Sequence, residues 1–175
     1  GGASGIGGGV IADGALLGGM SGHAGELGHI RVSSSSVTDS AGIRGTLEAE
    51  VTRAELMEAL GLPRAEPAQF EAALLSDRSA AVSAIVNRQL EHLATALASA
   101  INLFNPEVIA LGGFLAVLQA YDPGKLAAAV AASALAPSLE GVEITPAELG
   151  GDLLMIGAAG LAFHTLLNDP VSVAA

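Results

Sequence analysis

The run Asn105-Pro-Glu-Val-Ile-Ala-Leu-Gly-Gly113 decides the fold class, because it joins a long helical pattern to a short strand that ends in a glycine pair. Upstream of it, apolar residues recur every three or four positions, which predicts a helix over residues 77–104. The Asn-Pro step ends that helix, and Val108–Leu111 is typical of a buried parallel strand. A further strand is expected over residues 142–145. Strands that alternate with helices predict a layered α/β domain.

The N-terminal part predicts shorter elements. Residues 6–11 form a candidate strand, and Asp13-Gly14 is a strong signal for a two-residue hairpin turn. Ile30–Val32 is another candidate strand, and the serine-rich run over residues 33–40 is expected to be a mobile surface loop. Further helices are expected from Gly45 to the stop at Leu60–Pro63 and over residues 69–75, 114–120, 124–135 and 153–167.

The composition bounds the class of protein. Of the 175 residues, 51% are hydrophobic and 14% are charged, and the mean hydropathy is +0.56. The uncharged stretch over residues 108–121 contains Gly112-Gly113 and is too short to cross a bilayer, so we expect a soluble α/β domain. A net charge of −11 argues against direct contact with DNA or an anionic membrane. Cysteine is missing from the sequence, which excludes disulfides and thiolate metal ligands. The lack of cysteine fits the expectation of a cytoplasmic protein.

The segment Gly22-His-Ala-Gly-Glu-Leu-Gly-His-Ile30 carries the strongest functional signal. It places Glu26 and His29 three residues apart in a loop whose glycines allow close approach of a ligand. A carboxylate and an imidazole together can read hydroxyl groups. From the spacing alone, a loop glutamate beside a structural histidine is an equally good interpretation.

Two glycine-rich turns are candidates for binding an anion. In the first, Ser4-Gly5-Ile-Gly-Gly-Gly9 offers bare backbone N–H groups and the Ser4 hydroxyl. In the second, Gly112-Gly113 lies where a strand meets the start of a helix. Neither turn is followed by Lys-Ser or Lys-Thr, so neither is a Walker motif, and each taken alone is also explained as a plain tight turn.

The order of these motifs resembles that of the ROK family, which groups bacterial sugar kinases with sugar-responsive repressors on one actin-like ATPase fold. The resemblance extends from Ser4 to about Leu167, and Gly25–His29 is its most specific part. It implies an α/β domain with a mixed sheet flanked by helices, in which residues 1–175 form the C-terminal lobe. Because the chain starts without Met inside a glycine run, we expect a fragment that lacks the N-terminal lobe and any DNA-binding domain. The other matching motifs are Gly42-Ile-Arg-Gly-Thr-Leu-Glu48, Asn105–Gly113 and Ile156-Gly-Ala-Ala159.

The resemblance implies roles for particular residues. The sugar-hydroxyl contacts of the family fall on Glu26, His29 and Glu48, although Glu48 is also explained as an acid that favours a helix start. The nucleotide-side glycine turns fall on Ser4-Gly5 and on Gly112-Gly113. The family's catalytic aspartate lies upstream of the first glycine turn, so no catalytic residue is expected here.

Many family members bind zinc with the histidine that corresponds to His29 and with three cysteines. In this sequence the three cysteine positions are Asp39, Ala41 and Thr46. A structural zinc ion needs four good ligands, so we expect none, and the rigidity of the loop over residues 33–44 is in question. The acids Glu48, Glu50, Glu55 and Glu58 are expected to form a solvated helix face, and His92 and His164 to be packing or solvent residues.

Two parent functions remain open. The favoured expectation is a sugar-sensing transcriptional repressor whose DNA contact comes only through a missing N-terminal helix-turn-helix, since Glu48-Ala-Glu-Val51 and Gly112-Gly-Phe-Leu115 resemble the repressors of alanine-rich bacteria. The alternative is an ATP-dependent sugar kinase of the glucokinase type, in which case ATP is the cofactor. A structural domain with vestigial sites is a third interpretation. A small-molecule sugar is the expected partner, and a homodimer or tetramer is expected from the apolar, alanine-rich helices.

Overall fold

The computed structural model describes residues 5–168, and its central element is the helix α4 (Ala80–Phe104). Ser79 is extended and its hydroxyl accepts the Val82 N–H at 3.3 Å, so the helix begins at Ala80 rather than at the expected Asp77. Its end is as predicted, because Asn105 adopts a left-handed conformation (φ 43°) just before Pro106. One face of the helix is buried along its whole length, through Val82, Val86, Leu90, Leu93, Leu97 and Ile101.

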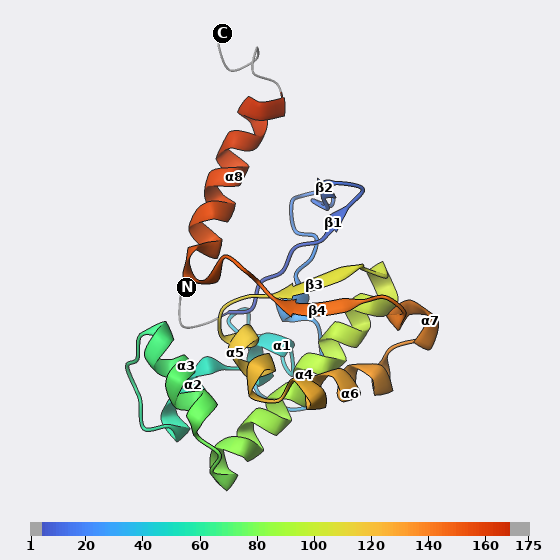
Figure 1. Cartoon of the computed structure of the whole chain (residues 1–175). Helices are drawn as coiled ribbons and strands as arrows, with labels where there is room; N and C mark the ends of the chain where they lie inside the picture. Colours follow the sequence, from blue (N-terminus) through green and yellow to red (C-terminus); the bar gives the residue numbers. More distant parts are fainter. Residues whose placement is uncertain (1–4, 169–175) are drawn as a thin grey trace.

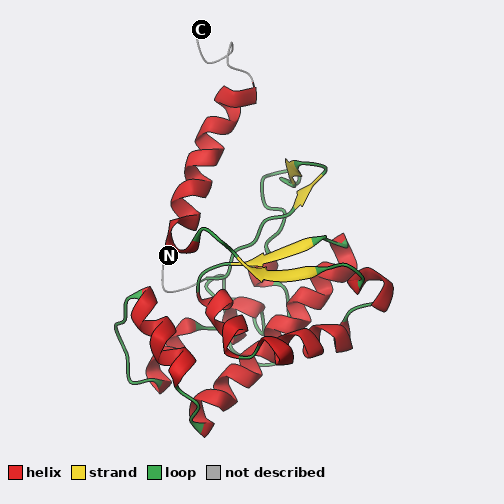
Figure 2. Ribbon diagram, viewed as in Figure 1, coloured by secondary structure: helices red, strands yellow, loops and turns green. Residues whose placement is uncertain are grey.

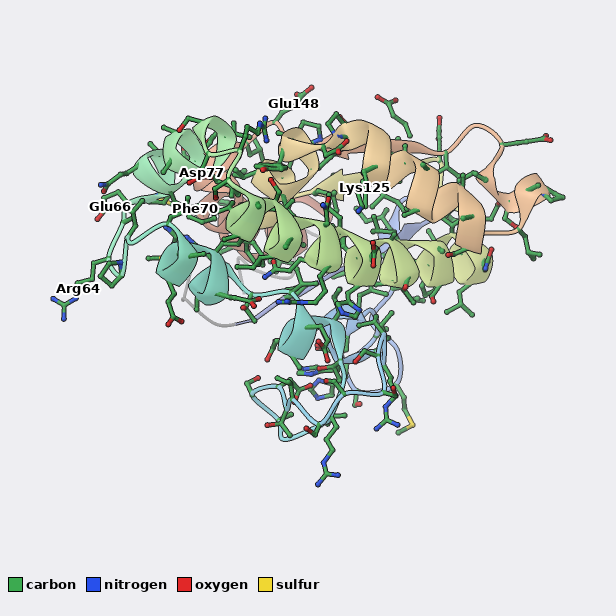
Figure 3. All side chains as sticks on the ribbon, turned by 90° about the horizontal axis from the view of Figure 1, so that it is seen from below. Arg64, Glu66, Phe70, Asp77, Lys125 and Glu148 are labelled. Carbon is green, nitrogen blue, oxygen red and sulfur yellow. The ribbon has the colours of Figure 1, made fainter. Side chains whose placement is uncertain are left out.

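Shorter helices cover this face of α4. The helix α6 (Pro123–Ser133) packs beside it, and α5 (Phe114–Tyr121) packs on both of these helices and on α3 (Pro67–Ser76) (Figure 1). Seen from below, the Phe70 side chain lies among the helices, whereas Arg64 extends away from them (Figure 3). These helices confirm the expected pattern, except that α6 ends at Ser133 and a separate short helix, α7 (Ala136–Leu139), follows.

Within residues 5–168 the strands form two separate two-stranded sheets. The strand β3 (Val108–Leu111) pairs in parallel with β4 (Glu143–Pro146), with Ile109 opposite Ile144. In the view shared by Figures 1 and 2, the helices α3, α5 and α6 and most of α4 lie below this pair of strands. The expected parallel strand is present, but its burial is partial: Leu111 is buried whereas Val108 is 49% exposed.

The hairpin expected at Asp13-Gly14 is present. The strands β1 (Ile11–Ala12) and β2 (Ala15–Leu16) are antiparallel, and both turn residues have positive φ, 52° and 76°. Residues 6–10, the first part of the expected strand, belong to no strand, although the Val10 carbonyl accepts the Leu17 N–H at 2.8 Å. The strand expected at Ile30–Val32 is reduced to one bridge between Arg31 and Thr46.

The helix expected from Gly45 onward is broken in two. It forms α1 (Leu47–Glu50) and α2 (Arg53–Ala59), because Val51 and Thr52 both leave the helical conformation while the Val51 side chain is buried. Near the C-terminus, the 3₁₀ turn η2 (Gly150–Asp152) leads into α8 (Leu153–Asn168), which projects from the other helices (Figure 1). No helix within residues 5–168 combines the length and apolarity that a membrane crossing requires.

Candidate functional site

The loop that carries Glu26 and His29 packs directly on the first glycine run. It includes the 3₁₀ turn η1 (Leu27–His29), and Gly28 within that turn is buried. A Cβ atom at Gly28 would lie only 1.8 Å from the carbonyl oxygen of Ile6, so this position excludes every side chain. The glycine at this point therefore serves close backbone packing, which fixes the loop against residues 6–8.

His29 is held by Asp39. Its Nδ1 atom lies 2.8 Å from Oδ2 of Asp39, and its side chain remains 30% exposed. The hydrogen bond with Asp39 raises the pKa of His29 against the opposing effect of burial, and the negative charges of Asp39, Glu48 and Glu26 raise it further. The imidazole thus has one nitrogen engaged and partial access to solvent.

Asp39 has no exposed side-chain surface and joins four groups. Its Oδ2 atom also accepts the Thr46 hydroxyl at 2.8 Å, and its Oδ1 atom accepts the backbone N–H groups of Ala41 at 2.9 Å and of Ile43 at 2.8 Å. Burial opposes the charged form, but the hydrogen bonds from His29, Ile43, Thr46 and Ala41 outweigh it and lower the pKa of Asp39 to about 2. We call these five residues the Asp39 cluster.

Glu48, on α1, connects three segments. Its Oε2 atom accepts the Ile6 N–H at 3.1 Å, and its Oε1 atom accepts the Ser40 N–H at 3.0 Å and the Ser40 hydroxyl at 2.5 Å. The Ser40 hydroxyl makes the largest contribution to lowering the pKa of Glu48. Capping of α1 is done by Thr46, which accepts the Ala49 N–H, so the alternative of a capping role for Glu48 is not supported.

Glu50 lies two residues further on and anchors the serine-rich loop. It accepts the Ser33 hydroxyl at 2.7 Å and also the Ser35 hydroxyl, and it lies 3.6 Å from Nε2 of His92 on α4. Its side chain is only 10% exposed. The expectation of a solvated acidic face is therefore wrong for Glu50. The serine-rich loop, which was expected to be mobile, is hydrogen-bonded to α1 through Ser33 and Ser35.

Glu26 differs from these acids. It is exposed, and its side chain makes no hydrogen bond to any other residue within the described range 5–168. Its charge nevertheless acts on His29, so it lies near the imidazole. The negative charges of Glu26 and Glu48 thus both act on the His29 imidazole, and the Glu26 side chain is exposed.

The two glycine turns lie at different places. Ser4 is outside the described residues, whereas Gly5 has φ 137° and a Cβ there would lie 3.2 Å from Oε2 of Glu48. Gly112 and Gly113 follow β3, and Gly113 (φ 59°) starts α5 with open space around it. A role of these glycines in binding a nucleotide stays a prediction.

The residues present do not fit the zinc site of the family. Ala41 offers no ligand atom, and the carboxylate of Asp39 is already surrounded by four hydrogen-bond donors. Within residues 5–168, no three His, Cys, Asp or Glu side chains are grouped so that they could hold a metal ion. The segments that carry His29, Asp39 and Thr46 are therefore joined by hydrogen bonds to Asp39 rather than by a metal ion.

Several residues of this site were missed by reasoning from the sequence. The roles of Ser40, Glu50 and His92 depend on contacts between distant segments, for which the spacing gives no signal. The serines at 33 and 35 were the one available hint, because alternate hydroxyls in a loop can bind one carboxylate.

Comparison with known proteins identifies the family. A model of the ROK family matches residues 3–165. The glucokinase of Thermotoga maritima is 32% identical over an alignment of 177 residues. The alignment covers 90% of this chain and 55% of that protein. The chain thus spans about half the length of this relative.

Solved structures agree with this result. A ROK hexokinase from Thermus thermophilus superimposes with a TM-score of 0.70 and 29% identity over 89% of this chain and 54% of the hexokinase. A ROK family transcriptional regulator, a homologue of the E. coli MLC protein, gives a TM-score of 0.66 and 25% identity over 81% of this chain and 39% of the regulator. The expected α/β class and actin-like ATPase fold are confirmed. The chain belongs to the ROK family.

Proposed function

We propose that this chain binds a sugar through Glu26, His29 and Glu48. The observation that carries the proposal is the exposure of these three side chains and the hydrogen bonds that they already make. Glu26 is exposed and unpaired among the described residues, His29 has one nitrogen engaged and one available, and Glu48 is held from two sides. Ionised carboxylates accept hydroxyl protons, and imidazole can accept or donate, which suits a polyhydroxy ligand.

For the whole protein, a sugar kinase is the first candidate. The glucokinase and the hexokinase are more similar in sequence to this chain than the transcriptional regulator is, which favours the kinase over the expected repressor. In such an enzyme this chain is the C-terminal lobe: it contributes the sugar contacts, and Gly5 and Gly112-Gly113 face the nucleotide. Phosphoryl transfer also requires the catalytic base and phosphate-binding groups of the other lobe, because positioning and charge neutralisation depend on both.

A sugar-responsive transcriptional regulator is the second candidate, favoured by the structural match to the regulator. In this case the sugar shifts DNA affinity only if it binds two conformations of the protein unequally. DNA contact then belongs to another domain, because the net charge of −11 leaves this chain few groups to neutralise phosphates.

Calorimetry on the intact protein with a panel of hexoses and N-acetylhexosamines tests the sugar site. Glu26→Gln is expected to weaken binding by about 1–3 kcal/mol, because the neutral amide is a poorer acceptor for the hydroxyl. Glu71→Gln, an exposed change on α3, is the control and should leave affinity unchanged. Unchanged affinity in Glu26→Gln, in Glu48→Gln and in a His29→Ala variant would refute the assignment.

A paired assay separates the two candidates. Sugar-dependent ATP turnover by the intact protein supports the kinase. Sugar-dependent retardation of DNA from upstream of its own gene, without turnover, supports the regulator.

A further inference from the structure

The hydrogen bonds around Asp39 determine where the proton of His29 lies. Thr46 Oγ1 accepts the Ala49 N–H and lies 2.8 Å from Oδ2 of Asp39, so its own proton points to that carboxylate. Two backbone N–H groups occupy the other carboxylate oxygen. An ionised carboxylate only accepts hydrogen bonds, so the remaining neighbour, Nδ1 of His29 at 2.8 Å, must also donate.

The same residue also orders the neighbouring loop. The Asp39 N–H donates to the Ile43 carbonyl at 2.9 Å, and the Asp39 carbonyl accepts the Gly42 N–H at 3.0 Å. Ser40, the next residue, donates twice to Glu48. Asp39 is therefore placed to position both His29 and the carboxylate of Glu48.

We propose that Asp39 is a positioning residue that holds the neutral imidazole of His29 with its proton on Nδ1 and so leaves Nε2 as the hydrogen-bond acceptor for a sugar hydroxyl, without a metal ion. In the zinc motif of the family, Asp39 and Thr46 stand at cysteine positions. The hydrogen bonds of the Asp39 cluster join the same segments that a metal ion would join. The hydroxyl contact rests on the sugar site proposed above, whereas the position of the proton depends only on the Asp39 cluster.

The variant Asp39→Asn tests this proposal with almost no change of shape. The two backbone N–H groups require an oxygen, so the amide oxygen turns to Ala41 and Ile43, and the amide NH₂ faces His29. A donor at that place forces Nδ1 to become an acceptor and moves the proton to Nε2. A proton shifted in this way by an Asp-to-Asn change can be costly even when the geometry survives.

The experiment combines two measurements on the intact protein. Long-range ¹H–¹⁵N NMR of the histidine rings, at an alkaline pH where imidazole is neutral, reports which nitrogen carries the proton. Calorimetry reports sugar affinity. The wild type is expected in the Nδ1–H form, and Asp39→Asn in the Nε2–H form with a loss of sugar affinity of about tenfold or more. A chelator should change neither result in the wild type.

Asp77→Asn is the matched control. Asp77 also lies in a loop and accepts a backbone N–H, that of Ser79, at 2.7 Å, but it lies next to the start of α4 rather than beside His29. This variant should keep both the proton position and the affinity. A wild-type His29 in the Nε2–H form, or an Asp39→Asn variant with unchanged proton position and affinity, would overturn the proposal.

The outcomes remain separable from the proposed function. If the wild type binds no sugar of the panel, the function fails, yet the NMR result still decides whether Asp39 sets the proton of His29. If Asp39→Asn does not fold, the wild-type proton position and its resistance to the chelator decide the inference.

Discussion

The helical core and the loop over residues 33–46 are held together by different forces. The core around α4 is almost purely apolar, and its largest buried side chains are completely covered, as Phe70 and Leu90 show. The loop is held by three carboxylates that accept hydroxyl and N–H groups: that of Asp39 within the loop, and those of Glu48 and Glu50 on α1. Apolar burial is non-directional and tolerates repacking, whereas a buried carboxylate needs each of its donors. The apolar core therefore contributes mainly to stability, whereas the carboxylates fix the geometry of the loop.

Truncation of the core should have the largest effect on stability. Leu90→Ala removes a side chain that is 0% exposed, and the lost contacts and the cavity cost about 2–5 kcal/mol. Leu103→Ala, on the same helix but 74% exposed, is the control and should cost little. Urea denaturation measures both free energies. Equal losses in the two variants would contradict the core described above.

A side chain at Gly28 should damage the contact between the sugar loop and the first glycine run. Gly28→Ala places a Cβ against the Ile6 carbonyl, and relief of that overlap costs about 1–3 kcal/mol. The control is Gly7→Ala, because a Cβ at Gly7 meets nothing within 4 Å. Thermal denaturation and sugar calorimetry measure the outcome. If the contact is as described, only Gly28→Ala lowers both the melting temperature and the sugar affinity.

Loss of the charge at Glu50 should release the serine loop at smaller cost. Glu50→Gln weakens the hydrogen bonds from Ser33 and Ser35 and the pairing with His92, which should lower the free energy of unfolding by about 1–2 kcal/mol. Amide hydrogen exchange should then increase over residues 33–37 and remain unchanged in α6. Exchange that rises equally in both regions would mean that the loop is not held separately.

Acid should weaken the loop before the core. Interactions in the folded state lower the pKa values of Asp39, Glu48 and Glu50, that of Asp39 from 3.8 to about 2. Their stabilising contribution is present above the pKa values of the unfolded state and is lost as the pH falls through the lower folded values. Stability should therefore decline as the pH is lowered from about 5 towards 2, with a smaller slope in Glu50→Gln and an unchanged slope in Leu90→Ala. Denaturation curves across this range measure the slopes.

The contribution of His29 to stability has the opposite pH dependence. Its pKa in the folded state is raised above 6.5, so this contribution is fully present below pH 6.5 and is lost as the pH rises through the folded pKa.

Removal of metal ions should have the smallest effect, namely none. After treatment with a chelator, elemental analysis should find no stoichiometric zinc, and the melting temperature should not change. The reason is the donor set of the Asp39 cluster, which lacks the ligands that tetrahedral zinc requires. One tightly held zinc ion per chain would show that the loop is organised by a metal after all.

The two regions also differed in how far the sequence predicted them. The 3–4 spacing of apolar residues predicted α4, and Asn105-Pro106 predicted its end, because both signals are local. The Asp13-Gly14 turn was predicted for the same reason. The break at Val51–Thr52 was not, because burial of Val51 decides it through packing with distant residues.

For the candidate site, the sequence supplied the residue types but not their partners. Glu26, His29 and Glu48 followed from motif positions, and in the structure the charges of both carboxylates act on His29. The bond from Ile6 to Glu48 joins residues 42 positions apart, and that from Ser33 to Glu50 joins residues 17 apart. Such pairs leave no periodic trace in the sequence. Asp39 shows the same limit, since the sequence placed it only at a cysteine position of the zinc motif, whereas the structure surrounds its carboxylate with hydrogen-bond donors.

The parallel pairing of β3 with β4 has a consequence for the order of folding. Val108 pairs with Glu143 only after the chain has passed through α5, α6 and α7, so a long loop must close before the first of these contacts forms. The hairpin β1–β2 closes over two residues and can form early, independently of the rest of the chain. Pairings between distant segments are slow to form, so β3–β4 should be among the last elements to gain protection during refolding, after α4 and α6 have packed.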